Sequence, residues 1–317
     1  MILKLKNLKR LSLLFLGASF ILNPLFLSCK AQKVQNNDRN KIVSTIFPFY
    51  DWAGNIIGKN DEKTINTLII KSGSGIHDFQ PSQSDISQIV NADIFIYNGN
   101  QIDFWAEEIL RQKANQNMTV LNLSDITSVE RLSSSSENHL WLSLRNAEVC
   151  VQAISDALCA KIPEMAEIFS QNCSEYIEEI ELLDSSFKSS LSKYTRKSLI
   201  HCDEFPFAPL AQDYNLNFLS AYSTCPAPAA TAESLTAPNI QPLADALSKE
   251  EAKALLVLEN SDKKISKAVI LEAKRPSCDT FVLDSMEHTT LWEAFKGRSY
   301  LGIMRENLET MEKSWHN

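Results

Sequence analysis

Glycine, proline and basic residues are scarce in this sequence, and each shortage excludes a class of protein. Among 317 residues there are only 8 Gly and 11 Pro, which is too few for a fibrous or low-complexity chain. The 31 Lys and Arg against 39 Asp and Glu leave a net charge of -8, which argues against a protein that grips phosphate backbones. We therefore expect no nucleic-acid partner. The hydrophobic share of 44% is high enough for a folded core, and the length suits one large domain or two ordinary ones.

Several sequence motifs of enzymes are also missing. The chain has no His-Glu-x-x-His run, no Gly-x-Ser-x-Gly elbow and no phosphate-binding P-loop. It has no Cys-x-x-Cys pair either, so a zinc knuckle made of thiolates is not supported. We therefore expect a protein that is not an enzyme and has no catalytic residues.

The N-terminus has the order of an export signal. A basic start at residues 4–10 precedes an apolar stretch, Leu11–Leu27, and a small residue and Cys29 follow. Cys29 comes directly after Leu-Phe-Leu-Ser, which resembles a lipobox, where the Cys is acylated and becomes the first residue. This pattern predicts a signal peptide at residues 1–28 and a lipidated Cys with a polar tether at residues 29–40. The protein is then expected in the periplasm or on the outer face of the cell membrane, held by its lipid.

A permanent membrane anchor is the alternative for the same segment. Its length approaches the roughly 20 apolar residues that a bilayer crossing needs. Asn23 and Pro24 interrupt the run, which favours the lipoprotein. Both interpretations place the rest of the chain outside the cytoplasm.

Six more cysteines follow Cys29, an even number that permits up to about three disulfides in an exported protein. The sequence alone does not decide whether they pair, and a chain of this length has core enough without them. They are Cys150, Cys159, Cys173, Cys202, Cys225 and Cys278.

Short apolar runs suited to buried strands occur in two sets of four, separated by stretches with helical patterns. This alternation indicates β/α units with parallel sheets. We predict an α/β fold with two lobes, residues 41–162 and 197–317, each with a four-stranded, mainly parallel sheet. The expected strands are Ile42–Phe47, Ile65–Ile70, Asp93–Tyr97, Met118–Leu121, Ser198–His201, Leu216–Tyr222, Ala254–Leu258 and Asp279–Leu283.

One long helix is predicted between the lobes, at residues 163–196. Apolar residues recur at intervals of three and four from Met165 to Tyr194, and no Gly or Pro interrupts the run. At about 1.5 Å per residue, such a helix is roughly 45 Å long, enough to bridge two lobes. An ordinary amphipathic packing helix is the alternative.

Three of the five histidines sit where a strand ends or where a loop enters a helix. They are His77, His139 and His201, and Asp284 closes a predicted strand in the same way. Ligands of parallel sheets gather at the carboxyl ends of the strands. Three imidazoles and one carboxylate in a cleft would suit zinc. His288 and His316 are expected to be surface residues.

Five short motifs around these residues occur in order along the chain: His77-Asp78-Phe79-Gln80-Pro81, Tyr97-Asn98-Gly99 with Trp105, His139-Leu140-Trp141-Leu142-Ser143, His201-Cys202-Asp203-Glu204-Phe205, and Phe281-Val282-Leu283-Asp284-Ser285. Together they resemble the metal-binding (zinc or manganese) substrate-binding lipoproteins of ABC transporters, cluster A-I. The resemblance extends from about Lys41 to the end of the chain. It departs from the family pattern at Glu137-Asn138, where Asp-Pro is usual, and at Cys202, where an acidic residue is usual. Ser133–Ser136 occupies the place of a long His-rich loop.

The resemblance implies two α/β lobes joined by a rigid helix, with one metal ion in the cleft. It implies that His77 and His139 of the first lobe and His201 and Asp284 of the second bind the metal, which is then delivered to the permease of an ABC transporter. Zn²⁺ is the expected ion, with Mn²⁺ and Fe²⁺ as alternatives. A monomer is expected.

Other functions stay open at this point. A helix-linked binder of siderophore, haem or cobalamin would need a wide cleft, a zinc hydrolase would need an open coordination position, and a surface adhesin is compatible with the lipid tether. For the metal binder, we expect release through local movement near His139 and Ser133–Glu137, because a continuous helix resists bending.

Overall fold

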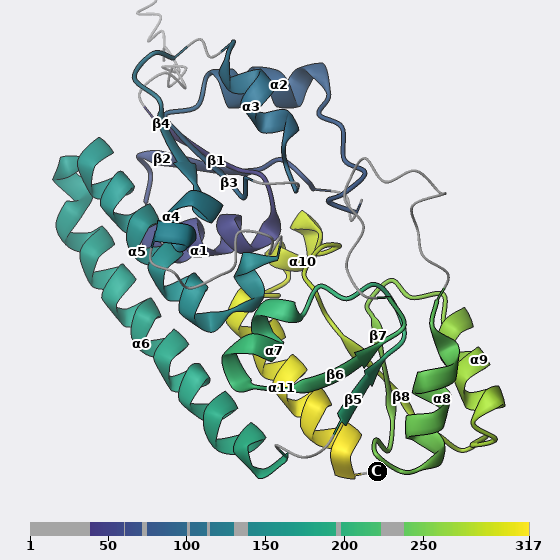
Figure 1. Cartoon of the computed structure of the whole chain (residues 1–317). Helices are drawn as coiled ribbons and strands as arrows, with labels where there is room; N and C mark the ends of the chain where they lie inside the picture. The colour runs from purple at the N-terminus through teal and green to yellow at the C-terminus, as the bar shows by residue number, and fades with distance from the viewer. Residues whose placement is uncertain are drawn as a thin grey trace, which may run out of the picture. The chain divides into compact units, whose positions relative to one another are not determined.

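The computed structural model describes residues 39–59, 61–71, 75–99, 102–112, 115–129, 139–194, 198–222 and 238–316 (Figure 1). The predicted signal peptide, Cys29, most of the tether, Ser133–Glu137 and Cys225 lie outside these ranges. Residues 38–317 form one compact unit. In the described part of the chain, no helix is long and apolar enough to cross a membrane.

The first lobe contains a parallel sheet of four strands in the order β2-β1-β3-β4. The strand β3 is an uninterrupted apolar run and is buried along its whole length, as expected for a strand covered on both faces. Figure 1 shows α2 and α3 on one side of this sheet and α1 and α4 on the other. The elements are β1 (Asn40–Ser44), α1 (Phe47–Ile57), β2 (Thr64–Leu68), α2 (Gln83–Val90), β3 (Ile94–Tyr97), α3 (Trp105–Leu110), β4 (Thr119–Asn122), α4 (Leu123–Val129), η1 (Leu140–Leu142) and α5 (Leu144–Lys161).

The second lobe repeats this plan with strands in the order β6-β5-β7-β8, again all parallel. Helices α8 and α9 pack against each other, and α11 packs along β8. The predicted α/β fold with two four-stranded parallel sheets is therefore confirmed. The elements are β5 (Ser198–His201), α7 (Ala208–Tyr214), β6 (Asn217–Ser220), α8 (Ile240–Ser248), β7 (Leu255–Leu258), α9 (Lys264–Glu272), β8 (Thr280–Leu283), α10 (Leu291–Phe295) and α11 (Tyr300–His316).

The long helix is α6 (Ala166–Leu191), flanked by the short turns η2 (Pro163–Met165) and η3 (Ser192–Tyr194). It touches both lobes, as Figure 1 shows. Near its start, the Asn172 side chain donates a hydrogen bond to the carbonyl oxygen of Ile56 at 2.9 Å. Near its end, Asp184 accepts a 2.7 Å hydrogen bond from the hydroxyl of Tyr214 in α7. The buried stripe follows the predicted spacing and consists of Phe169, Cys173, Tyr176, Ile180, Leu183, Phe187 and Leu191.

One apolar core cluster runs from the first lobe into α6 and α11, and a second cluster lies within the second lobe, between its sheet and helices α8 and α9. The Trp52 and Tyr300 rings meet edge to face with centroids 5.1 Å apart, although Trp52 belongs to α1 and Tyr300 begins α11. The five described cysteines, Cys150, Cys159, Cys173, Cys202 and Cys278, are all free thiols. Packing between the lobes therefore holds the described part of this fold together, without disulfides among its residues.

Candidate metal centre

His77 lies in the loop between β2 and α2. The loop ends at Ser82, whose hydroxyl caps α2 while the Asp85 carboxylate bonds back to the Ser82 backbone. Next to His77, the Phe79 ring lies against Trp105 of α3, with centroids 5.6 Å apart. These contacts connect the loop to α2 and α3, and the side chain of His77 is only 12% exposed. Burial lowers the pKa of His77, so the imidazole is neutral at pH 7.

His139 comes directly before the turn η1 and is buried, with 3% of its surface exposed. The Ser143 hydroxyl caps α5 by accepting a hydrogen bond from the Asn146 backbone at 3.1 Å. The Asn146 amide in turn donates to the Leu140 carbonyl at 3.2 Å. The helix cap thus fixes the segment from which His139 projects. The His139 ring meets the His77 ring with centroids 5.4 Å apart.

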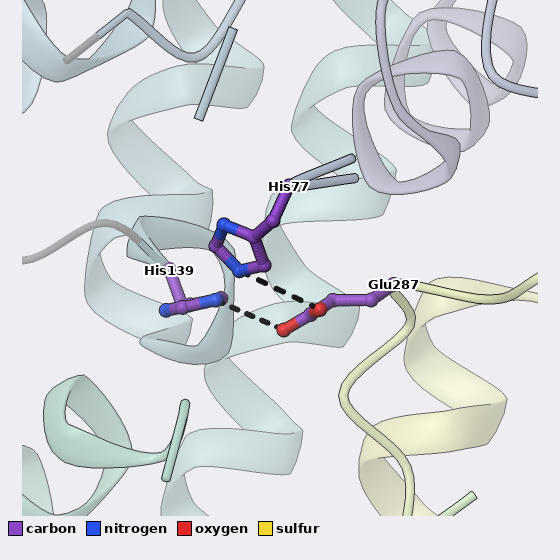
Figure 2. Close-up of side chains that lie close together, drawn as sticks. All are labelled: His77, His139 and Glu287. Carbon is purple, nitrogen blue, oxygen red and sulfur yellow. Dashed lines mark ion pairs between the residues drawn. The ribbon is translucent and has the colours of Figure 1, made fainter. Parts of the chain in front are cut away.

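Glu287 lies in the loop after β8 and faces both histidines (Figure 2). Its Oε1 atom is 2.9 Å from Nε2 of His139, and its Oε2 atom is 3.7 Å from Nε2 of His77. One ligand atom from each of the three residues lies within 4.8 Å of the others. Neither Nε2 of His139 nor Oε1 of Glu287 has a hydrogen-bond partner in the described part of the chain, and both atoms are buried. This arrangement suits a cation bound by both atoms, each of which would donate a lone pair to it.

The loop that carries Glu287 has an unusual backbone. Met286 has a positive φ of 66°, a conformation that a side-chain-bearing residue rarely adopts without support. The support comes from Asp284, whose Oδ1 atom accepts the Met286 N–H at 2.7 Å, and from the Asn307 side chain, which bonds both the N–H and the carbonyl of Asp284 at 2.8 Å. The tight turn directs Glu287 inward.

Asp284 itself, predicted as a ligand, does not join this group. Its carboxylate forms an ion pair with Arg298. It lines a separate cavity of about 440 Å³ together with Glu259 and His288. The structure therefore gives Asp284 a cationic side-chain partner, and the carboxylate that meets the histidines belongs to Glu287. The sequence held one signal for Glu287, namely that the same short loop after the predicted strand carries a second carboxylate.

His201, the last residue of β5, is fully buried. It is not one of the three residues whose ligand atoms lie within 4.8 Å. Its Nδ1–H donates to the carbonyl of Asp203 at 3.2 Å, while its Nε2 atom has no hydrogen-bond partner among the described residues. Burial lowers the pKa of His201. A neutral imidazole with one nitrogen held by a carbonyl and the other unpartnered is in the state that a metal ligand needs.

The two remaining histidines lie elsewhere. His288 is within 3.3 Å of Glu259, and this hydrogen bond raises the pKa of His288. His316 is exposed near the end of α11, beside Tyr194. Neither belongs to the group around Glu287.

The sequence is similar to a known protein family over most of its length. The sequence profile of ZnuA, described as zinc-uptake complex component A periplasmic, matches residues 42–314. Zinc-binding protein AdcA of Streptococcus pyogenes serotype M3 is 28% identical over 306 residues, which are 89% of this chain and 57% of that protein. The chain thus spans a little over half the length of this relative. The high-affinity zinc uptake system protein ZnuA of Bacillus subtilis is 24% identical over 90% of this chain and 91% of its own length.

The fold is similar to that of solved structures. The Zn(II)-bound ZnuA-like domain of Streptococcus pneumoniae AdcA superposes with a TM-score of 0.70 at 23% identity, over 88% of this chain and all of that domain. This likeness supports the two-lobed architecture. Because the profile covers almost all of the described residues, the chain belongs to the ZnuA family of zinc-uptake components.

Proposed function

We propose that this protein captures a divalent metal ion, zinc, outside the cytoplasm and delivers it to the permease of an ABC transporter. The observation that carries the proposal is the buried group of His77, His139 and Glu287, whose ligand atoms lie within 4.8 Å of one another. Burying a polar atom without a hydrogen bond destabilises the fold, and this site contains two such atoms next to each other, Nε2 of His139 and Oε1 of Glu287. Such a site favours the binding of a further partner. Membership of the ZnuA family supports the same function.

The proposed ligands are His77, His139 and Glu287, with His201 as the fourth. His201 qualifies because its Nε2 atom is buried and has no partner among the described residues. Asp284, the ligand that the sequence suggested, is left out because Arg298 already holds its carboxylate. Four protein ligands make a closed site that suits capture and release, whereas a hydrolytic zinc enzyme keeps an open position for water. We accordingly propose a carrier that is not an enzyme.

Zinc is the proposed cargo because three imidazoles and one carboxylate form a nitrogen-rich site. Mn²⁺ prefers oxygen ligands and stands low in the affinity order, while Fe²⁺ stands above it. Iron or manganese bound by the same residues is therefore the alternative. A siderophore, haem or cobalamin is not favoured, because His139 and Glu287 are buried and only a small ion fits between side chains this close.

The place of action follows from the N-terminus. We propose that Cys29 carries the lipid that holds the protein at the membrane surface, facing the permease. Labelling of the whole cell with a radioactive fatty acid, comparing the natural chain with Cys29→Ser, tests this part. Loss of label and release of the protein from the membrane are expected for the variant.

The central experiment is a metal analysis followed by a titration. Protein purified without chelator should contain about one zinc per chain, the stoichiometry of a single closed four-ligand site. His139→Ala should then weaken zinc binding strongly in a chelator competition, while the matched control His316→Ala, at an exposed histidine, should not. Equal affinities in the two variants would contradict the proposed site.

A further inference from the structure

The loops that carry His139 and Glu287 are joined by a direct hydrogen bond. The indole N–H of Trp141, two residues after His139, donates to the carbonyl oxygen of Ser285, two residues before Glu287, at 2.9 Å. The donor and acceptor are 144 residues apart in the chain and are buried. We propose that Trp141 is a positioning residue of the metal site, which sets the distance between His139 and Glu287 through this bond. The inference rests on the proposed function.

Trp141 is itself held firmly. The Tyr300 hydroxyl donates to the Trp141 carbonyl at 2.7 Å, and the Phe49 ring packs edge to face with the indole. The Trp141 side chain is completely buried. The indole also contacts the His139 ring, with centroids 5.1 Å apart. One rigid side chain therefore touches one proposed ligand and anchors the loop of another.

The acceptor side is linked to Glu287 just as closely. The Ser285 hydroxyl accepts a hydrogen bond from the Glu287 N–H at 3.4 Å and donates to the Glu259 carboxylate at 2.8 Å. The Ser285 N–H also donates to Glu259, at 3.0 Å. Ser285 is thus fixed by the second lobe through Glu259 and by the first lobe through Trp141. The strained backbone at Met286 lies between Ser285 and Glu287 and needs such support.

Removing the indole donor would leave the buried Ser285 carbonyl without this bond. The peptide that follows Ser285 would then be free to turn, Met286 could relax from its positive φ, and Glu287 would lose its place opposite His139. The binding site would lose preorganisation while the core stays folded. Zinc affinity should fall for this reason, although Trp141 does not bind the metal.

Trp52 provides a matched control. It is also completely buried in the same core and packs against Tyr300 and Phe49. Its indole nitrogen, however, has no hydrogen-bond partner in the described part of the chain. Trp52→Phe and Trp141→Phe therefore remove similar apolar volume, but only the second removes a bond to the Glu287 loop.

The test measures zinc affinity by chelator competition, together with the melting temperature of the zinc-free protein. We expect Trp141→Phe to raise the zinc Kd about tenfold and Trp52→Phe to raise it less than about threefold, with both zinc-free variants folded and Trp141→Phe melting at the lower temperature. In the Glu287→Gln background, adding Trp141→Phe should change the Kd by less than about twofold, because the residue that it positions is already disabled. A role in core packing alone would give equal effects of the two Phe variants, or the same tenfold loss in both backgrounds, and would overturn the inference.

The outcomes separate this inference from the proposed function. If the unmodified protein binds no zinc, the proposed function fails and the inference fails with it. If the unmodified protein binds zinc and the Trp141→Phe and Trp52→Phe variants bind it equally well, only the inference fails.

A second measurement covers the case in which Trp141→Phe does not fold. In unmodified protein with ¹⁵N-labelled tryptophan, the indole resonances are assigned with Phe variants at the four other tryptophans. Hydrogen exchange of the Trp141 indole N–H should slow on adding zinc, since the metal closes the two loops around its bond, and that of Trp52 should change little. An unchanged exchange rate at Trp141 would contradict the proposal.

Discussion

Nε2 of His139 and Oε1 of Glu287 approach to 2.9 Å, although one residue belongs to the first lobe and the other to the second. Neither atom makes a hydrogen bond with a described residue. A nitrogen and a carboxylate oxygen at this distance attract each other only when a proton or a cation lies between them. The contact thus brings an imidazole of the first lobe and a carboxylate of the second lobe together at one buried point.

The choice between Glu287 and Asp284 as a ligand can be tested directly. Glu287→Gln should weaken zinc binding by more than roughly a hundredfold, because loss of a ligand exceeds the tenfold to hundredfold cost of losing a supporting group. Asp284→Asn should cost less, since Asp284 pairs with Arg298. Isothermal titration of both variants gives the comparison. A larger loss for Asp284→Asn would restore the ligand set suggested by the sequence.

Metal preference follows from the donor atoms. In competition titrations at equal concentrations, Zn²⁺ should bind more tightly than Fe²⁺, and Fe²⁺ more tightly than Mn²⁺. Tighter binding of Mn²⁺ than of Zn²⁺ would show that imidazole nitrogens do not dominate the site. The variant His201→Glu tests the fourth ligand. If His201 binds the metal, this variant should bind Mn²⁺ more tightly relative to Zn²⁺ than the unmodified protein does.

Acid should release the metal. Metal-binding imidazoles must be neutral, and protons compete as the pH falls. Burial lowers the pKa of His77 and of His201 below the usual 6.5, so both stay neutral at pH 7. Protons therefore compete with the metal for these imidazoles only in more acidic solution. Zinc affinity should therefore be nearly level above about pH 7 and fall as the pH decreases toward about 4, with more than one proton bound per zinc released. A flat profile down to about pH 4, the pKa of His201, would exclude these histidines as ligands.

A buried carboxyl at the junction of the lobes should make stability depend on pH. Asp51 in α1 accepts hydrogen bonds from the Tyr300 N–H and the Tyr176 hydroxyl, at 3.2 and 3.3 Å, yet burial raises its pKa from 3.8 to about 6. A carboxyl with a higher pKa in the folded than in the unfolded chain binds more protons when folded. The folded state therefore loses stability as the pH rises from about 4 through about 6.

Asp51→Asn removes this titration while keeping an acceptor oxygen and a similar shape. Relative to the variant, the natural protein should lose about 2 kcal/mol of unfolding free energy between about pH 4 and about pH 7. Urea denaturation of both proteins at several pH values measures the difference. Parallel pH profiles for the two proteins would mean that folding does not raise the pKa of Asp51.

The continuous helix α6 limits how far the lobes can separate. It has 26 residues and is tied to the first lobe through Asn172 and Tyr176 and to the second through Asp184. We expect zinc-free and zinc-loaded proteins to give the same radius of gyration in X-ray scattering within experimental error, while hydrogen exchange slows around His139 and Glu287. A large compaction on adding zinc would show that α6 bends as a hinge.

Local sequence patterns were enough for the architecture. Apolar runs of strand length predicted each of the eight strands within a few residues, and the intervals of three and four predicted the buried stripe of α6. These predictions succeed because backbone hydrogen bonding gives helices and strands a fixed geometry, so that residues facing the core recur at a fixed interval along the sequence. The end of a strand and the entry of a loop into a helix are equally visible, and this is why His77, His139 and His201 could be singled out as candidates.

Only the tertiary structure decided which carboxylate meets the histidines. Asp284 and Glu287 share one short loop, which has no helical or strand periodicity that could tell which of the two side chains faces the histidines. Arg298 lies 14 residues further along the chain and holds Asp284, while the positive φ of Met286 turns Glu287 toward His139. The bond from Trp141 to Ser285 is likewise invisible in the sequence, because its partners are 144 residues apart. The sequence determined where each strand and helix lies, but the direction of a loop side chain depends on partners that only the folded chain brings together.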